Sequence, residues 1–292
     1  MNKLRWNGFW PAVFCAVLFF AAGCGEVVRS GTLEAQTPVL NSAEVSNEAS
    51  QTENPSKKSP LLESAKTDVL NWPRRVIEDS KDTFLKKDNL SALLLAGGIS
   101  IAMHQSNADK NIAEHLERHA AFHGFADESF NVMGHPVTHF AATGLWYVLS
   151  AESEDEYNRE RAWTMTTALS VTGVITMGLK AIRDNETPNG KRWAWPSGHT
   201  SSSFTVAAVL DEFYGPKVGI PAYAVASVVA YRMMDTGDHW ASDVVFGATL
   251  GWVVGHTIAG KHKKLEIAGF TVLPYMGNGD GPTAGISLVK QF

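Results

Sequence analysis

Apolar residues recur at helical spacing over most of the chain beyond about residue 66. Eight segments share this pattern, with apolar positions three or four residues apart and Gly, Pro, Asn, Asp or Ser near their ends. The predicted helices span residues 68–85, 89–103, 107–122, 136–150, 154–182, 200–213, 218–233 and 242–259. Most of their apolar stretches are roughly 11–18 residues long, which favours buried core helices, although 163–182 is long enough to cross a bilayer.

The last residues follow a different pattern. Apolar and polar residues alternate over 267–275 and again over 284–292, and the glycine-rich segment 277–281 lies between them. Alternation around such a segment predicts a β-hairpin. We therefore expect one all-α domain over residues 66–264, with a short hairpin over 265–292.

The N-terminus has the layout of an export signal. Lys3 and Arg5 precede an apolar run over 9–20, and small residues follow up to Cys24. Small residues directly before a cysteine resemble a bacterial lipobox, which implies cleavage after residue 23 and lipidation of Cys24. An ordinary signal peptide and an uncleaved anchor are the alternatives. No acidic residue follows the cysteine at position 25, which implies an outer-membrane lipoprotein on the periplasmic face of the cell envelope.

Residues 24–65 are polar and poor in large apolar side chains, which predicts a disordered tether between the lipid and the helical domain. The whole chain has 292 residues, of which 45% are hydrophobic and 19% charged. These values exclude a wholly disordered or collagen-like protein. The net charge of −5 argues against a nucleic-acid partner. The two cysteines, Cys15 and Cys24, both precede the helical domain, so no disulfide is expected within it.

The segment Pro196-Ser197-Gly198-His199 stands directly before an apolar helix. Glycine lets the backbone approach a ligand closely, and the first amides of a helix have no partner within it, so an anion could bind there. His199 could then deliver a proton to a leaving group. A plain helix cap with an incidental histidine is the alternative.

A second cluster surrounds the start of the last predicted helix. His239 and Asp243 are four residues apart and therefore share one face, so the carboxylate could fix the tautomer of the imidazole. The other ring nitrogen would be free as a nucleophile. Arg232 precedes this pair and could bind phosphate oxygens with its planar fork. A capped helix with a surface histidine is the alternative.

The third candidate is Lys180, near the end of the longest apolar helix. Considered alone, a lysine at such a position is more simply interpreted as one that extends its ammonium group to the surface. Together the three clusters resemble the motifs of the type 2 phosphatidic acid phosphatase (PAP2) superfamily: K-x6-R-P, P-S-G-H and S-R-x5-H-x3-D. This superfamily also includes bacterial acid phosphatases and vanadium haloperoxidases. The resemblance covers roughly residues 90–260 and implies a PAP2-like helical bundle.

The resemblance also implies roles for individual residues. His239 would be the nucleophile that forms a phosphohistidine, Asp243 would orient it, and His199 would act as acid and then base. The implied phosphate ligands are Lys180, Arg232 and the backbone of Ser197 and Gly198. The implied substrate is a phosphorylated small molecule or lipid, and neither a cofactor nor a metal is implied.

The chain departs from the family pattern at three places. Thr187 occupies the position of the arginine in the first motif, and Arg183, Lys191 or Arg192 could replace that cation, with Arg183 and Arg192 favoured. Tyr231 replaces serine in the third motif. Six residues, instead of five, separate Arg232 from His239. These changes keep two other functions open: a haloperoxidase-like enzyme that uses vanadate, and a non-catalytic anion-binding protein of the envelope.

Two further features have weaker implications, and the oligomeric state is left open. The histidines at positions 115, 119 and 123 would share a helix face, but no matching carboxylates or cysteines accompany them, so a polar face is favoured over a metal site. Trp193 and Trp195 flank the phosphate-binding segment and could form either an apolar rim for a lipid or part of the packing.

Overall fold

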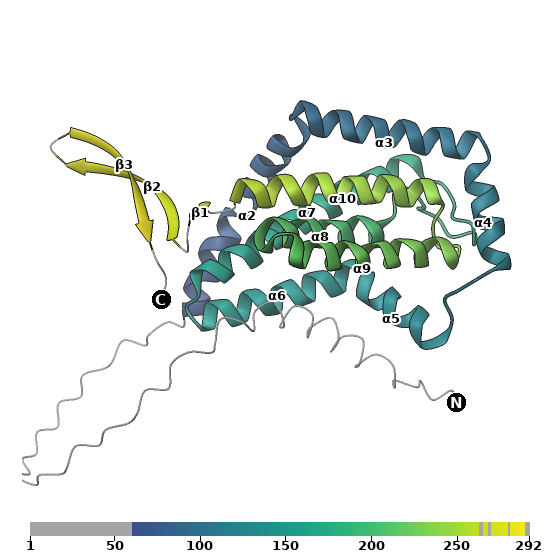
Figure 1. Cartoon of the computed structure of the whole chain (residues 1–292), viewed down its shortest axis with the longest axis horizontal. Coiled ribbons are helices and arrows are strands. Elements are labelled where there is room, and N and C mark those ends of the chain that lie inside the picture. The colour runs from purple at the N-terminus through teal and green to yellow at the C-terminus, as the bar shows by residue number, and fades with distance from the viewer. Residues whose placement is uncertain (1–59, 263–264, 268–269, 280, 290–292) are drawn as a thin grey trace, which may run out of the picture.

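The structure is a computed structural model that describes residues 60–262, 265–267, 270–279 and 281–289. The predicted signal peptide, the lipidation site Cys24 and nearly all of the predicted tether lie outside these residues. The helices are α2 (Pro60–Phe84), α3 (Lys87–Gln105), α4 (Ala108–Arg118), α5 (Gly124–Gly134), α6 (Pro136–Glu152), α7 (Glu156–Arg183), α8 (Gly198–Tyr214), α9 (Pro216–Asp235) and α10 (Ala241–His262). The prediction of a helical bundle is confirmed (Figure 1).

The observed helices correct the predicted ones at three places. Helix α2 begins at Pro60, within the segment assigned to the tether. The helix predicted over 107–122 ends at Arg118, because His119 leaves the helical conformation with φ −132°. Helix α5 was not predicted, because its 11 residues form no strong periodic stripe of apolar positions.

Helices α8 and α10 form the centre of the bundle, and α7 and α9 pack beside them (Figure 1). The buried core comes mainly from these helices and α6, with Met165, Leu169, Val209, Leu250 and Val254 almost completely inaccessible to solvent. Burial of such side chains is the main favourable contribution to folding. The first turns of α8 and α10 are therefore held by the best-packed part of the molecule.

A stripe of glycines on α10 allows its close contact with α8. A Cβ atom at Gly247 would lie 2.8 Å from the carbonyl oxygen of Ser197, and one at Gly251 would lie 2.2 Å from that of Ser201. Because no larger side chain fits at these distances, glycine is needed for the two helix backbones to approach. The close approach brings the start of α8 beside the start of α10.

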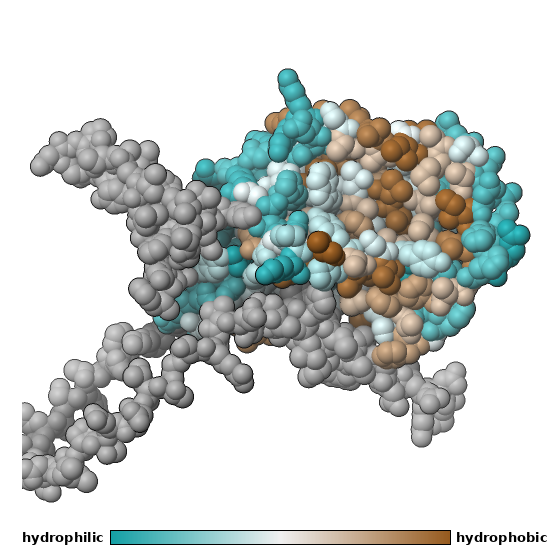
Figure 2. All heavy atoms as spheres, in the orientation of Figure 1, coloured by the Kyte–Doolittle hydropathy of each residue, from teal (hydrophilic) through white to brown (hydrophobic). Residues whose placement is uncertain are grey.

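The outer surface of the bundle is unusually apolar. Large hydrophobic side chains are exposed on α3, including Leu94, Leu95 and Ile101, and on α6, including Val137 and Leu149. Figure 2 shows hydrophobic residues gathered across the middle of the face formed by α10, α9 and α3, with hydrophilic residues towards both ends. A contiguous apolar surface of this kind is typical of a protein or membrane contact.

Among the described helices, α7 has the length and composition needed to cross a membrane. In its most apolar window 44% of the residues are buried inside the protein. Core helices of soluble proteins meet the same criterion.

The chain ends in a small antiparallel sheet of β1 (Leu265–Ile267), β2 (Phe270–Gly279) and β3 (Gly281–Val289), in that order. Strands β2 and β3 pair with Thr271 opposite Val289 and Gly279 opposite Gly281. The predicted hairpin is thus confirmed, but its glycine-rich segment 277–279 is extended and paired instead of forming a wide turn. Strand β1 was not predicted, since three residues are too few to show a periodic pattern.

Candidate functional site

The N-terminus of α8 forms the floor of the site. Ser197 is the N-cap, and its hydroxyl accepts hydrogen bonds from the amide and the hydroxyl of Thr200. A Cβ atom at Gly198 would lie 3.9 Å from the Thr176 methyl group and 4.0 Å from Cε of Lys180. Helix α7 therefore brings Lys180 against the first turn of α8. Free amides at such a turn, together with the helix dipole, favour an anion.

His239 and Asp243 form a buried pair at the start of α10. Nδ1 of His239 lies 3.3 Å from Oδ2 of Asp243, which also accepts a hydrogen bond from the amide of Trp240. The carbonyl oxygen of Asp243 accepts a 3.1 Å hydrogen bond from the amide of Ser197, which joins this pair to the α8 cap. Burial lowers the pKa of His239 in spite of its hydrogen bond to Asp243, so the imidazole is neutral near pH 7.

His199 lies in the first turn of α8 and faces a second histidine. Its ring centroid is 5.1 Å from that of His135, the N-cap of α6, and the rings meet edge to face. Nε2 of His199 is buried without a hydrogen-bond partner. Burial, together with the charges of His135, His239 and Arg232, lowers the pKa of His199 to about 3. This imidazole is therefore neutral until a negative charge comes near it.

Lys180 is buried at the end of α7, and its ammonium donates to the carbonyl oxygens of Trp193 and Ala194. Burial lowers the pKa of Lys180 to about 8, although the negative charge of Asp243 opposes that shift. The lysine thus contributes a positive charge at neutral pH that backbone dipoles stabilise. The side chain of Lys180 also lies next to Gly198, the first residue of α8.

Arg232 lies near the end of α9 and is bound by two carboxylates. Its Nε donates to Asp127 of α5 over 2.7 Å, and its Nη1 donates to Asp238 over 2.6 Å. Only 5% of the residue is exposed. Much of the charge of Arg232 is thus compensated by protein carboxylates.

Asp238 directly precedes His239 within the lengthened third motif, and it organises a second set of contacts. Its carboxylate accepts hydrogen bonds from Nζ of Lys191 over 2.7 Å and from Nδ2 of Asn189 over 2.9 Å. Burial alone would raise the pKa of Asp238, but these two hydrogen bonds and the charge of Arg232 hold it well below its usual range. The group is therefore ionised at any physiological pH.

Thr187, in place of the family arginine, shapes the loop that presents these groups. Its side chain is buried, donates to the amide oxygen of Asn189 over 2.7 Å, and accepts a hydrogen bond from the amide of Lys191 over 2.9 Å. Where the family pattern has an arginine, this chain thus has a threonine that stabilises a turn. The turn brings Lys191 to Asp238, which also binds Arg232.

The two favoured substitutes for the lost cation lie elsewhere. Arg192 forms an exposed ion pair with Asp184, and the guanidinium of Arg183 lies 5.2 Å from the Trp195 ring centroid. The role of both in phosphate binding stays a prediction. Of the flanking tryptophans, Trp195 packs on Phe246 and donates to Ser100, whereas Trp193 is 45% exposed.

The three regularly spaced histidines do not share one helix. His115 lies in α4, His119 ends it, and His123 precedes α5, although the rings of the first two are in contact, with centroids 4.6 Å apart. Within the described residues, no group of three or more His, Cys, Asp or Glu side chains is placed to hold a metal ion.

Sequence reasoning missed three groups at the site: Asp127, His135 and Asp238. The signal for Asp238 was its position directly before His239 in the lengthened third motif. His135 directly precedes the proline that opens α6, where an N-cap is expected. Asp127 had no signal, since α5 was itself not predicted.

Comparison with known proteins identifies the fold of this site. Residues 178–266 match the family model described as the PAP2 superfamily, and the matched segment contains all three predicted motifs. The chain contains a PAP2 superfamily domain. The family resemblance seen in the sequence is thereby confirmed, and the segment between Lys180 and Asp243 lies wholly within this PAP2 domain.

The PAP2 domain also resembles individual proteins. The lipid A 1-phosphatase of Porphyromonas gingivalis is 38% identical over 65 residues, which make up 21% of this chain and 15% of that protein. A transmembrane PAP2 type phosphatidylglycerolphosphate phosphatase from Bacillus subtilis has a TM-score of 0.47 and 17% identity, over 59% of this chain and 94% of that one. LpxE from Aquifex aeolicus has a TM-score of 0.42 and 19% identity, over 50% and 90%.

Proposed function

We propose that this protein is a phosphatase that hydrolyses phosphomonoesters or pyrophosphates, with lipid phosphates as its natural substrates, through a phosphohistidine on His239. The observation that carries the proposal is the buried His239–Asp243 pair, hydrogen-bonded through Asp243 to the cap of α8. In the proposed mechanism this pair leaves Nε2 of His239 free to attack a phosphate held by the α8 start and Lys180.

In the first step, Nε2 of His239 attacks phosphorus, and the bond from phosphorus to the leaving oxygen breaks. Asp243 stabilises the positive charge that develops on the ring. Lys180, Arg232 and the amides at the α8 start stabilise the charge on the equatorial oxygens, which is where most of the rate enhancement in phosphoryl transfer arises.

His199 protonates the leaving oxygen in this step and then takes a proton from the water that cleaves the phosphohistidine. In the free protein its pKa of about 3 keeps it neutral. A phosphate dianion bound beside it raises that pKa, because an opposite charge nearby favours the protonated ring. The proton therefore enters together with the substrate, and the neutral base is restored when phosphate leaves.

Lipid phosphates are proposed because the relative from Porphyromonas gingivalis is named for such a substrate. The apolar outer residues of α3 and α6 support a membrane-associated location in the cell envelope. We further propose export, lipidation of Cys24 and attachment to the outer membrane at its periplasmic face. Membrane retention of a Cys24→Ala variant after a high-salt wash measures how much the anchor contributes beyond the apolar surface.

The decisive experiment measures phosphate release from p-nitrophenyl phosphate, phosphatidic acid and isoprenyl pyrophosphate. Wild-type protein is compared with His239→Ala and with the control His115→Ala, which removes an exposed histidine outside the site. We expect activity in the wild type and the control and a loss of at least about 10⁴-fold in His239→Ala. Acid-quenched protein should carry an acid-labile phosphate on His239.

Equal activity in wild type and His239→Ala would contradict the phosphohistidine mechanism. Phosphate binding without turnover in any variant would instead favour the anion-binding function. Halide oxidation by peroxide that requires vanadate would favour the haloperoxidase.

A further inference from the structure

Ser242 is the second residue of α10 and lies directly before Asp243 of the candidate nucleophile pair. It is buried, and its amide is one of the first amides of the helix, which have no partner within it. This amide donates to Oδ1 of Asp109 in α4 over 2.9 Å, and the Ser242 hydroxyl donates to Oδ2 over 2.6 Å. Asp109, which belongs to another helix, thus caps the start of α10.

Asp109 is an almost fully buried carboxylate, with 2% of the residue exposed. It lies in the first turn of α4, and Figure 1 shows α4 at the end of the bundle where α10 begins. Nδ1 of His104, a half-exposed side chain of α3, lies 3.3 Å from Oδ2 of Asp109. Hydrogen bonds to an ionised acceptor are stronger than neutral ones, and a negative charge is favourable at a helix N-terminus. The start of α10 is therefore fixed by charge-assisted contacts.

The carbonyl group of Ser242 is bound as well. It accepts a 3.2 Å hydrogen bond from the hydroxyl of Ser100 in α3. That hydroxyl in turn accepts a 3.0 Å hydrogen bond from Nε1 of Trp195, which directly precedes the phosphate-binding segment. The amide, the hydroxyl and the carbonyl of Ser242 therefore all have a partner in α3 or α4, and α3 also contacts the segment that leads into α8.

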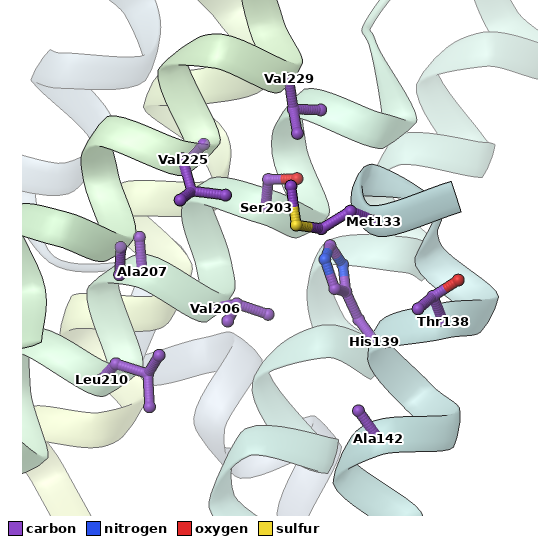
Figure 3. Close-up of a pocket in the computed structure, with 12 residues that line it drawn as sticks. Met133, Thr138, His139, Ala142, Ser203, Val206, Ala207, Leu210, Val225 and Val229 are labelled. Carbon is purple, nitrogen blue, oxygen red and sulfur yellow. The ribbon is translucent and has the colours of Figure 1, made fainter. Parts of the chain in front are cut away.

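The contacts of α8 with α6 and α9 are of another kind. Figure 3 shows aliphatic side chains there, among them Val206, Val225 and Val229. Apolar contacts stabilise a fold without fixing a direction, whereas hydrogen bonds have preferred distances and angles. The contacts of Ser242 with α3 and α4 are therefore suited to set the position of a helix start as well as its burial.

We infer that Asp109 is a positioning residue for the proposed reaction: through Ser242 it fixes Asp243 and, with it, the ring of His239. The inference rests on the proposed function. Neighbouring Cα atoms are about 3.8 Å apart, so a shift of Ser242 also moves Asp243. The carboxylate of Asp243 lies 3.3 Å from Nδ1 of His239 and moves the ring with it. A nucleophile misplaced by about 1 Å can react about 10²-fold more slowly.

The first test measures kcat for p-nitrophenyl phosphate and the inhibition constant of inorganic phosphate. Asp109→Asn keeps the size of the side chain but replaces its charge-assisted hydrogen bonds with neutral ones. The anion site has other supports, because Ser197 caps α8 and a backbone carbonyl binds Lys180. We expect kcat to fall about tenfold while the inhibition constant stays within about twofold of wild type. An unchanged kcat, or an equal loss of phosphate affinity, would overturn the inference.

Asp155→Asn is the matched control. Asp155 caps α7, where its carboxylate accepts hydrogen bonds from the amide and the side chain of Asn158. It lies about 37 Å along the helix from Lys180. Both variants lose a carboxylate at a helix start and should have similar melting temperatures, but Asp155→Asn should keep the wild-type kcat. A matching loss of kcat in this control would overturn the specific role of Asp109.

A double variant tests the path through Ser242. Ser242→Ala removes the hydroxyl that bonds Oδ2 of Asp109 and should by itself lower kcat about fivefold. Because Asp109→Asn weakens the same contact, the two changes together should cost little more than the larger single loss. Losses that multiply would show that Asp109 acts by another route. Ser242→Ala keeps the amide contact, so it provides the comparison of kcat with phosphate affinity even if Asp109→Asn does not fold.

Orthovanadate separates this inference from the proposed function. Five-coordinate vanadate takes a nucleophile as a ligand and mimics the transition state, so its affinity depends on where the ring nitrogen of His239 lies, whereas phosphate needs only the anion site. By titration calorimetry, Asp109→Asn should bind vanadate about tenfold more weakly and phosphate as tightly as wild type does. If no substrate is hydrolysed yet binding follows this pattern, the phosphatase proposal fails and the role of Asp109 stands. Equal changes for both anions, or no change for vanadate, would overturn that role.

Discussion

Lys180 and Arg232, two cations of the candidate site, are held in opposite ways. Lys180 is bound by backbone carbonyls, whereas Arg232 is bound by the carboxylates of Asp127 and Asp238. Carbonyl dipoles leave the charge of the lysine available to a ligand, while the two carboxylates compensate the charge of the arginine. Two motif cations that are expected to bind the same phosphate can therefore offer it different amounts of uncompensated positive charge.

Replacing Lys180 should have the largest effect. Lys180→Met keeps the length and apolar stem of the side chain but removes its charge, so kcat/KM for p-nitrophenyl phosphate should fall about 10²–10³-fold. Lys217→Met, an exposed change, should leave it unaltered. A loss of less than tenfold would mean that Lys180 does not contact the transferring phosphoryl group.

Replacing Arg232 should have a smaller effect because its charge is already shared. Arg232→Lys keeps a cation but loses the planar fork that reaches Asp127 and Asp238 together, and we expect kcat/KM to fall about 10–100-fold. Arg74→Lys on exposed α2 is the control. If Arg232→Lys costs more than Lys180→Met, the proposed ranking of the two cations is wrong.

The pH profile should show the titration of Lys180. Its pKa of about 8 is that of the free protein, so kcat/KM should decline above pH 8, approaching tenfold for each pH unit as the ammonium loses its proton. The Lys180→Met variant should lack this decline, and Lys180→Arg should move it to higher pH. A decline that persists in Lys180→Met would assign it to another group.

Removing the charge of Asp238 should have the smallest effect, in the opposite direction. Asp238→Asn keeps a similar shape while it removes an anion that repels phosphate and compensates Arg232 and Lys191. We expect inorganic phosphate to inhibit about 3- to 10-fold more tightly. Asp88→Asn in exposed α3 is the control; weaker inhibition in Asp238→Asn would show that holding the two cations matters more than repulsion.

Particular residues show how far the sequence predicts this structure. The spacing of His239 and Asp243 predicted their pairing, but His239 precedes α10, and its backbone amide is held by a hydrogen bond to the carbonyl oxygen of Met233. The helix predicted from residue 200 begins two residues earlier, at Gly198, with Ser197 as its N-cap. The end of α4 at His119 and the short helix α5 were not predictable, since both depend on contacts such as that between Asp127 of α5 and Arg232 of α9.

The loop around Thr187 illustrates the same limit within the site. From the sequence, the missing arginine pointed to Arg183 or Arg192 as substitutes. In the structure the loop turns so that Lys191 meets Asp238, while Arg192 pairs with Asp184. Spacing along the chain could not show which of these basic residues points towards Asp238, because the fold of the loop sets the direction of each side chain.

The sequence by itself determined the helical bundle, the three PAP2 motifs and the histidines on which the proposed chemistry depends. These features depend on periodicity and on residues close together in the chain. Only the tertiary structure decided which cations are compensated by carboxylates and that the ring of His135 adjoins that of His199. Those properties come from the packing of α5, α6, α8 and α9, whose contacts join residues far apart in the sequence.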